Sequence, residues 1–241
     1  MNKSGTFTFK QFQIKQDSCI MKVNTDAILL GAWSDVVRKN HTLDVGTGTG
    51  IIALMLAQRN ANMQVVGIDV DLNAYMQAQN NMKNSPFNHQ LKAYFSSIQE
   101  FSIDSNQKFD LIVSNPPFFS GGTFSHNENK ANIRHTLKLS HIDLLRSVKS
   151  LLSTDGHFDV ILPYIEGLRF IELAMQYNFH LEKITEVFPN NDKKIERLLL
   201  RLGLQPVNGI LKDTLVVQQS TTANDYSEEY CKLTKDFYPF L

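Results

Sequence analysis

The sequence has few cysteines, no net charge and no long apolar run, and each of these features excludes a class of protein. Its two cysteines, Cys19 and Cys231, lie far apart without metal-binding spacing, so we expect reduced thiols, as in a cytoplasmic protein. The 24 basic and 24 acidic side chains argue against nucleic-acid binding through bulk charge, although not against a local basic patch. No stretch resembles a signal peptide or a membrane helix, so neither secretion nor membrane insertion is expected. The histidines also lack metal-ligand spacing, so no metal is expected.

From residue 41 onward, short apolar runs alternate with stretches of helical periodicity. This alternation is typical of βαβ units, in which helices connect parallel strands. Strand-like runs cover residues 41–46, 63–70, 90–97, 108–114, 156–163, 181–189, 195–204 and 213–220, and helical ones cover 51–59, 72–85, 141–153 and 164–179. We predict an α/β fold with a mostly parallel seven-stranded sheet and helices on both faces. Residues 1–40 are expected to form a small cap of strand and helix, and residues 41–241 the main domain, both within one globular unit.

The stretch LDVGTGTG, from Leu43 to Gly50, lies between the first strand and the helix after it. In open parallel sheets, such a loop gathers backbone amides at a helix N-terminus and binds ligands. A dinucleotide-binding loop would need a small residue where this chain has Ile51. Asp44, just before the glycines, would repel a pyrophosphate but attract an ammonium group. For a glycine cluster taken alone, a plain turn is the alternative.

Asp69, at the end of the second strand, narrows the choice of ligand. Its carboxylate is placed to accept hydrogen bonds from two ribose hydroxyls, although a helix N-cap or an ordinary strand-end carboxylate is the alternative. A cofactor with a ribose, a positively charged amino-acid end and no phosphate would satisfy both aspartates. S-adenosylmethionine is that molecule.

A run of two prolines and two phenylalanines, in the stretch SNPPFF that begins at Ser114, follows the apolar run FDLIV. Proline fixes φ and lacks an N–H donor, so the chain must leave the sheet at this point. One interpretation is a turn that only ends a strand, with core aromatics behind it. The other is an active site, in which a rigid turn presents an amide and an aromatic ring to a substrate.

The motifs LDVGTGTG, VVGIDVD and SNPPF, in this order and spacing, resemble those of the class I, Rossmann-like S-adenosylmethionine-dependent methyltransferases. The resemblance covers about residues 41–205 as a fold. In that family the motif of Asn or Asp, two prolines and an aromatic residue marks enzymes that methylate a planar amino or amide nitrogen. The resemblance therefore implies the active-site interpretation.

Under this interpretation, the residues from Asn115 to Phe118 form the catalytic turn. The exocyclic amine of adenine is a poor nucleophile because its lone pair is delocalised into the ring. The side-chain oxygen of Asn115 and the carbonyl oxygen of Pro116 would accept both of its protons and favour a tetrahedral nitrogen. Pro117 stiffens the turn, and the ring of Phe118 offers a face on which an extruded base stacks. No strong general base is needed.

The resemblance also implies which residues bind the cofactor. The family usually has an acidic residue after the third strand that accepts from the adenine amine, but this chain has YFSSIQ there. Ser97, or Ile98 through its backbone, would take that place. The segment before residue 34 is expected to close the methionine end, with Thr25 and Asp26 as helix caps. The predicted cofactor contacts are Lys22, Thr25, Asp44, Gly46, Thr47, Gly48, Gly50, Asp69, Val70, Ser97, Ile98 and Asn115.

Two further stretches, Phe7 to Trp33 and Ala131 to Leu145, resemble a bacterial family of tRNA adenine-N6 methyltransferases. The similarity continues through HFDVILP to the C-terminal FYPFL. Members of that family modify the adenosine immediately 3′ of the anticodon in a valine tRNA. A single-stranded base in an anticodon loop can be splayed out and stacked, which suits the turn described above. The expected partner is therefore the anticodon loop of a valine tRNA, with substrate contacts from Phe118, Lys130, Arg134 and Lys138.

Three alternatives remain open on the sequence alone. The same motif could methylate adenine N6 in another RNA or in DNA. It could also methylate a glutamine N5 in a protein, although such enzymes use an appended helical domain and only about 40 residues precede the sheet here. A non-catalytic RNA-binding module is the third alternative, against which the intact motifs argue.

Overall fold

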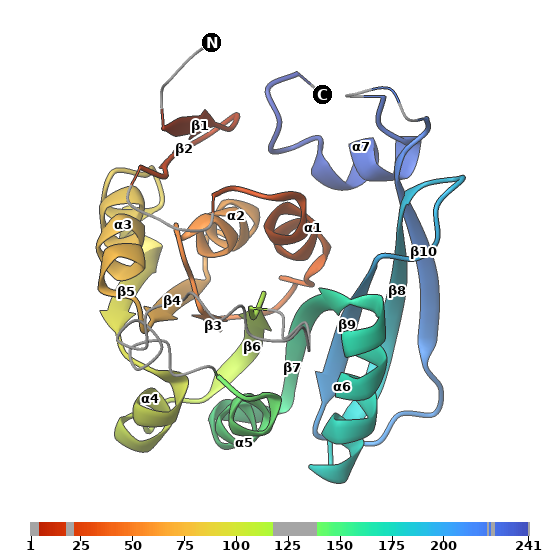
Figure 1. The fold of residues 1–241 in the computed structure, drawn as a ribbon. Coiled ribbons are helices and arrows are strands. Elements are labelled where there is room, and N and C mark those ends of the chain that lie inside the picture. The colour runs from red at the N-terminus through yellow and green to blue at the C-terminus, as the bar shows by residue number, and fades with distance from the viewer. Residues whose placement is uncertain (1–4, 18–21, 118–138, 221, 223–224, 241) are drawn as a thin grey trace, which may run out of the picture.

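The computed structural model describes residues 5–17, 22–117, 139–220, 222 and 225–240. An eight-stranded sheet runs through its centre in the order β10-β8-β9-β7-β6-β3-β4-β5 (Figure 1). Its strands are β3 (His41–Val45), β4 (Gln64–Asp69), β5 (Leu91–Phe95), β6 (Phe109–Ser114), β7 (Leu152–Pro163), β8 (His180–Asn190), β9 (Arg197–Gly203) and β10 (Leu211–Gln218). All neighbouring pairs are parallel except those of β9, which is antiparallel to β7 and β8.

The α/β architecture is as predicted, but the sheet has eight strands and not seven. All eight strand-like runs of the sequence join this one sheet; the last of them, residues 213–220, overlaps β10, which pairs in parallel with β8 at the edge. The first half of β10 is exposed, and its first two residues, Leu211 and Lys212, precede the strand-like run.

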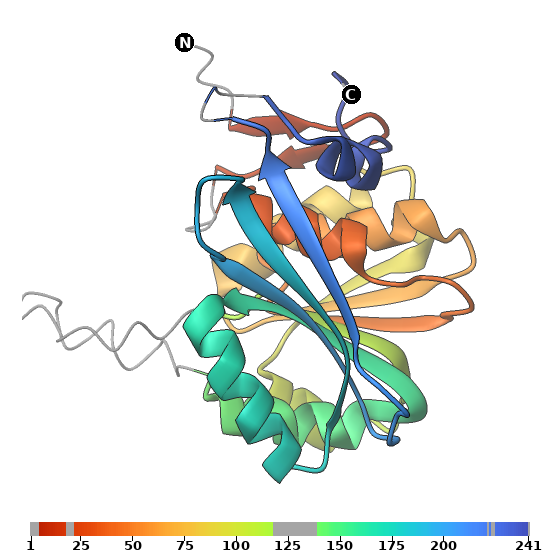
Figure 2. The same ribbon diagram turned by 90° about the vertical axis from the view of Figure 1, so that its right-hand side faces the viewer.

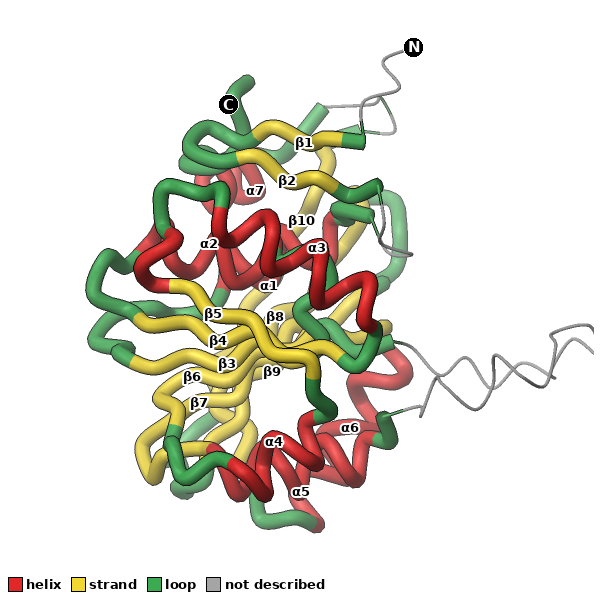
Figure 3. The backbone as a smooth tube through the Cα atoms, turned by 90° about the vertical axis from the view of Figure 1, so that its left-hand side faces the viewer, coloured by secondary structure: helices red, strands yellow, loops and turns green. Residues whose placement is uncertain are grey.

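Helices cover both faces of the sheet (Figures 2 and 3). They are α1 (Thr25–Trp33), α2 (Ile51–Arg59), α3 (Leu72–Lys83), α4 (Ile98–Asp104), α5 (His141–Leu151), α6 (Tyr164–Gln176) and α7 (Glu228–Thr234), with a 3-10 turn, η1 (Asn88–Gln90), before β5. Residues of α1, α2, α3 and α7 belong to one buried apolar cluster, and those of α4, α5 and α6 to a second. The inner strands are therefore apolar on both sides; in β6, Phe109, Leu111, Ile112 and Val113 are fully buried. No helix in the described part of the chain is both long and apolar enough to cross a membrane.

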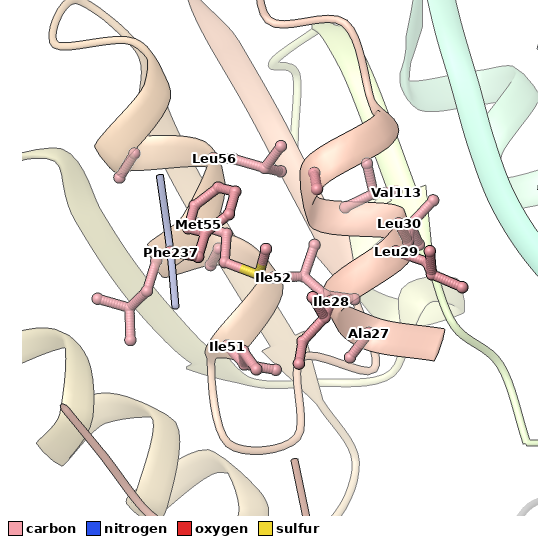
Figure 4. Packing of buried hydrophobic residues seen from close by; sticks show 14 of the residues in the cluster. Ala27, Ile28, Leu29, Leu30, Ile51, Ile52, Met55, Leu56, Val113 and Phe237 are labelled. Atoms are coloured by element: carbon pink, nitrogen blue, oxygen red, sulfur yellow. The ribbon is translucent and has the colours of Figure 1, made fainter. Parts of the chain in front are cut away.

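The N-terminal region contributes a hairpin and a helix. Strands β1 (Thr6–Thr8) and β2 (Gln13–Lys15) form a separate two-stranded sheet. Helix α1 packs against α2, and Figure 4 shows apolar side chains of both helices in one buried cluster. Residues before position 40 thus share the core of the main domain, and the proposed boundary at residue 40 stays a prediction.

The expected cap of α1 was wrong by one residue. Asn24 is the N-cap, and its Oδ1 accepts a hydrogen bond from the backbone of Ala27 at 2.9 Å. Thr25 and Asp26 are the first two helical residues instead. The Asp26 carboxylate accepts from Nε of Arg197 at 2.9 Å, which ties the start of α1 to the start of β9.

The carboxyl ends of four parallel strands meet at one edge of the sheet. Val45 of β3 lies opposite Ile68 of β4 and Ser114 of β6, and Asp69 lies opposite Phe95 of β5. The residues that follow these strands, which include the glycine loop and Asn115, are consequently neighbours in space. This edge is where ligands bind in open α/β sheets.

Candidate active site

The glycine loop leaves β3 in a conformation that only glycine adopts easily. Gly46, Gly48 and Gly50 all have positive φ, at 71°, 58° and 82°. The amides of Gly46 and Thr47 donate to the carbonyl of Ile68 at 2.9 and 3.0 Å, which holds the loop against β4. A Cβ at Gly46 would meet no atom within 4 Å, so the loop borders open space on that side.

Asp44 lies beneath this loop and is fully buried. Its Oδ2 accepts from the hydroxyl of Thr47 at 2.6 Å, whereas no described residue donates to its Oδ1. Burial raises the pKa of Asp44 to about 7, and the hydrogen bond from Thr47 and the nearby backbone of Ala53 only partly oppose this. A buried carboxylate with a free oxygen fits a cationic ligand, because a neighbouring positive charge would stabilise its ionised form.

Asp69 is not the cap of the helix that follows it, and its carboxylate bonds to the glycine loop. Its Oδ2 accepts from the amide of Gly48 and its Oδ1 from the amide of Asp71, both at 2.9 Å. The N-cap of α3 is Asp71, whose side chain accepts from Ala74. Burial also raises the pKa of Asp69. Two hydrogen bonds leave lone pairs on the carboxylate, so it can still accept from hydroxyl groups of a ligand.

The adenine end of the predicted cofactor site is bordered by Val70, Ser97 and Ile98. The side chain of Val70, next to Asp69, is 47% exposed and offers an apolar surface. Ser97 is the N-cap of α4 in a capping box with Glu100, so its hydroxyl is already engaged on both sides. Ile98 is buried in the core, so only its backbone could reach an adenine. The direct role predicted for the Ser97 hydroxyl therefore competes with helix capping.

The catalytic turn begins where β6 is fixed to β3. The hydroxyl of Ser114 is buried and donates to the carbonyl of Val45 at 3.0 Å, which the sequence did not reveal. The next side chain, Asn115, has a buried Oδ1 to which no residue of the described chain donates. Pro116 is buried and Pro117 is exposed. An amide oxygen is thus available beside the glycine loop.

The remaining predicted site residues are less constrained. Lys22 and Thr25 lie near the start of α1 and are exposed. Phe118, Lys130, Arg134 and Lys138 lie outside the described residues, so their roles stay predictions.

The residues present fit S-adenosylmethionine. The buried Oδ1 of Asp44 suits its ammonium group, the open side of Gly46 leaves room for it, and Asp69 keeps acceptors for its ribose. The amides of Gly46, Thr47 and Gly48 are already bonded within the chain, so these three are not free to bind a pyrophosphate.

Comparisons with known proteins agree with this geometry. A family model for the methyltransferase small domain matches residues 24–162. A protein from Erwinia tasmaniensis named tRNA1(Val) (adenine(37)-N6)-methyltransferase is 40% identical over 235 residues, or 97% of this chain and 95% of that protein. A protein of the same name from Haemophilus influenzae is 42% identical over 233 residues, or 96% of this chain and 97% of that protein.

Solved structures confirm the fold class. A predicted O-methyltransferase from Agrobacterium tumefaciens superposes with a TM-score of 0.69 at 15% identity, over 88% of this chain and 96% of that one. A glycopeptide N-methyltransferase complexed with S-adenosylmethionine gives a TM-score of 0.54 at 10% identity, over 75% and 93% of the two chains. At these identities the likeness establishes the Rossmann-like methyltransferase fold alone.

Proposed function

The chain belongs to the methyltransferase small domain family, and from this premise we propose that it methylates the exocyclic N6 nitrogen of an adenosine in tRNA, with S-adenosylmethionine as the methyl donor. The finer proposal is the adenosine immediately 3′ of the anticodon in a valine tRNA. This is the substrate that the names of both relatives state for those proteins. A tRNA substrate supports a cytoplasmic location for the proposed activity.

One observation carries the proposal most directly. The buried Oδ1 of Asn115 lacks a donor among the described residues, beside a loop that fits the cofactor. Buried side-chain oxygens are nearly always hydrogen-bonded in proteins, so an unsatisfied one at a sheet edge requires an explanation. An amino group of the substrate would satisfy it.

The residues of the chain would divide the work as follows. S-adenosylmethionine, when bound, supplies a methyl group on a positively charged sulfur. Asp44 would hold the ammonium group and Asp69 the ribose hydroxyls. Asn115 and the carbonyl of Pro116 would orient the target amine, and the proline turn limits the entropy lost on binding. The proton that leaves the amine becomes acidic only when the nitrogen is alkylated, so it can pass to water.

The Ser114 hydroxyl supports this geometry from beneath. Because it bonds to the carbonyl of Val45, the strand that ends at Asn115 cannot shift relative to the strand that leads into the glycine loop. Methyl transfer depends on alignment of the two reacting atoms, so this fixed spacing favours catalysis.

The proposal is tested with the purified protein, labelled S-adenosylmethionine and total tRNA from a strain that lacks the corresponding gene. After digestion to nucleosides, we expect label in N6-methyladenosine, and capture of individual tRNAs should place it in a valine isoacceptor. The Asn115→Ala variant and ribonuclease-treated tRNA serve as controls. Label in a protein fraction would favour a glutamine methyltransferase, and label in another nucleoside would also contradict the proposal.

A further inference from the structure

Asn81, on the buried side of α3, joins the glycine loop to the N-terminal hairpin. Its side chain is 4% exposed. Its Nδ2 donates to the carbonyl of Thr49, inside the glycine loop, and to the carbonyl of Lys15, both at 2.8 Å. Its Oδ1 accepts from the amide of Lys15 at 3.0 Å. One amide side chain thus bonds to two segments that lie far apart in the sequence.

The geometry of the hairpin explains why Lys15 is available for Asn81. Lys15 faces Thr6 across the β1–β2 pair, and the next residue, Gln16, donates its amide to Gly5 on the other strand. In an antiparallel pair, alternate residues exchange both hydrogen bonds and their neighbours turn both backbone groups outward. Lys15 is one of these outward-facing residues. The side chain of Asn81 bonds to both its N–H and its C=O, as the backbone of a further strand would.

The connection extends to the start of α1. The side-chain oxygen of Gln16, directly after Lys15, accepts from the amide of Val23 at 2.8 Å. Val23 precedes Asn24, the N-cap of α1. Asn81 therefore bonds directly to the carbonyl of Thr49. Through Lys15 and Gln16, it also holds Val23, which leads into the helix that packs against α2.

We propose that Asn81 is a positioning residue for the cofactor site: it holds the hairpin β1–β2 and the approach to α1 against the glycine loop, and so sets the affinity of the loop for S-adenosylmethionine. This inference rests on the proposed function only for the identity of the cofactor. A loop with three left-handed glycines has much conformational freedom to lose on binding. A bond from α3 to Thr49 removes part of that freedom before the cofactor arrives, which favours binding.

The first test replaces the amide with groups that cannot donate. Asn81→Asp keeps the shape and the acceptor for Lys15 but sets a carboxylate against two carbonyl oxygens. Asn81→Ala removes the three bonds to Lys15 and Thr49, and also the longer one that Oδ1 accepts from Nε2 of Gln77 at 3.5 Å. We expect calorimetry to show affinity for S-adenosylmethionine about tenfold weaker in both variants. The matched control is Asn80→Asp, since Asn80 is exposed on the same helix and its Oδ1 accepts from Asn84, which a carboxylate can continue to do. This control should bind as the unaltered protein does.

The second test asks whether Asn81 acts through Lys15. Lys15→Pro removes the outward amide of Lys15 but none of the bonds between β1 and β2, because that amide does not join the two strands. We expect Lys15→Pro to weaken cofactor binding several-fold in the unaltered protein, and to have a much smaller effect when it is combined with Asn81→Ala. Additive effects would contradict a shared route.

A purely structural role for Asn81 has a different signature. In that case the variants would unfold at lower temperature but would bind S-adenosylmethionine with unchanged affinity well below the unfolding transition, and this result would overturn the inference. Failure of the unaltered protein to bind S-adenosylmethionine would overturn the proposed function and this inference together. Binding without tRNA methylation would overturn the proposed substrate alone.

Discussion

At the scale of single residues, the proposed site contains two buried oxygen atoms, Asp44 Oδ1 and Asn115 Oδ1. Neither has a hydrogen-bond donor among the described residues, although Asp44 lies in β3 and Asn115 directly follows β6, two strands that pair with each other. Leaving such a group unsatisfied typically disfavours the folded state by about 1–3 kcal/mol. Under the proposed function, the ammonium group of the cofactor would satisfy the oxygen of Asp44, and the amino group of the substrate would satisfy that of Asn115.

The raised pKa of Asp44 predicts that cofactor affinity depends on pH. In the free protein this carboxyl has a pKa of about 7, and an ammonium group beside it would lower that value, so binding releases a proton. Affinity should therefore rise about tenfold per pH unit as the pH increases toward the pKa of Asp44. It should level off near pH 7 and fall again above about pH 8, where the α-amino group of the cofactor loses its own proton. Calorimetry in two buffers of different ionisation enthalpy measures the proton released.

The stability of the free protein should respond to pH in the opposite direction. Because the pKa of Asp44 is raised on folding from its ordinary 3.8, the folded state holds the proton more tightly than the unfolded state. The protonated carboxyl therefore contributes its full stabilisation of the folded state below about pH 4. This contribution is lost as the pH rises from about 4 to about 7. Asp44→Asn should abolish that loss and flatten the acidic side of the affinity profile, while binding the cofactor weakly at every pH. A profile for Asp44→Asn that matches the unaltered protein would exclude Asp44 as the group that titrates.

The role of Asn115 predicts a separation of binding from catalysis. Asn115→Ala removes the acceptor for the target amine, and we expect kcat to fall at least about a hundredfold, as for other single groups that act in the transition state. Affinity for S-adenosylmethionine should change little. Asn115→Asp keeps acceptor oxygens at this position, so it should retain much more activity than the alanine variant. Equal losses in both variants would indicate that the turn needs the amide for its shape, and full activity of Asn115→Ala would refute the assignment.

At the scale of elements, the residue that caps α4, Ser97, is also the residue predicted to lie at the adenine end of the cofactor site. Ser97 caps this seven-residue helix, and its hydroxyl is shared with the backbone and side chain of Glu100. Ser97→Ala should destabilise the protein by about 1 kcal/mol, as loss of an N-cap usually does. If Ser97 serves only as a cap, Ser97→Asp should restore stability, and cofactor affinity should follow stability in both variants. A loss of affinity in Ser97→Asp without loss of stability would indicate direct contact between the hydroxyl and the cofactor.

The elements that the sequence predicts correctly share a physical reason. Inner strands such as β3 and β6 are buried on both faces and read as unbroken apolar runs, and the glycines that follow β3 mark a loop that needs positive φ. The parallel arrangement then brings Asp44, Asp69 and Asn115 to one edge without further information. The sequence alone is therefore sufficient to predict that these three residues lie at the same edge of the sheet.

The elements that the sequence does not reveal lack such patterns. Helices α4 and α7 have seven residues each, too few for a clear helical period. The capping box Ser97–Glu100 is nevertheless a signal that could have identified α4. Asn81 and Ser114 gave no signal, because their partners are backbone carbonyls that only the tertiary fold brings near.

At the scale of the whole molecule, aromatic side chains join the N-terminal hairpin to the C-terminal region. Tyr238 is buried; its ring lies 6.2 Å from that of Phe9 and 4.9 Å from that of Phe240, and its hydroxyl lies 3.1 Å from that of Tyr230 in α7. The backbone adds a bond from the amide of Lys10 to the carbonyl of Phe237 at 2.7 Å. The two regions therefore support each other, and the hairpin that Asn81 fixes to the glycine loop depends on residues more than two hundred positions away.

This arrangement predicts that a substitution near the C-terminus loosens the N-terminal hairpin. Tyr238→Ala should destabilise the protein by about 3 kcal/mol, as removal of a buried aromatic ring usually does. Hydrogen exchange should increase in β1–β2 as well as in α7, because both lose the same packing partner. Tyr238→Phe loses only the bond to Tyr230 and should cost about 1 kcal/mol, while Phe240→Ala, at a ring that is 61% exposed, should have a still smaller effect. If exchange rises in α7 alone, the hairpin is held by Asn81 and the core without help from the C-terminal region.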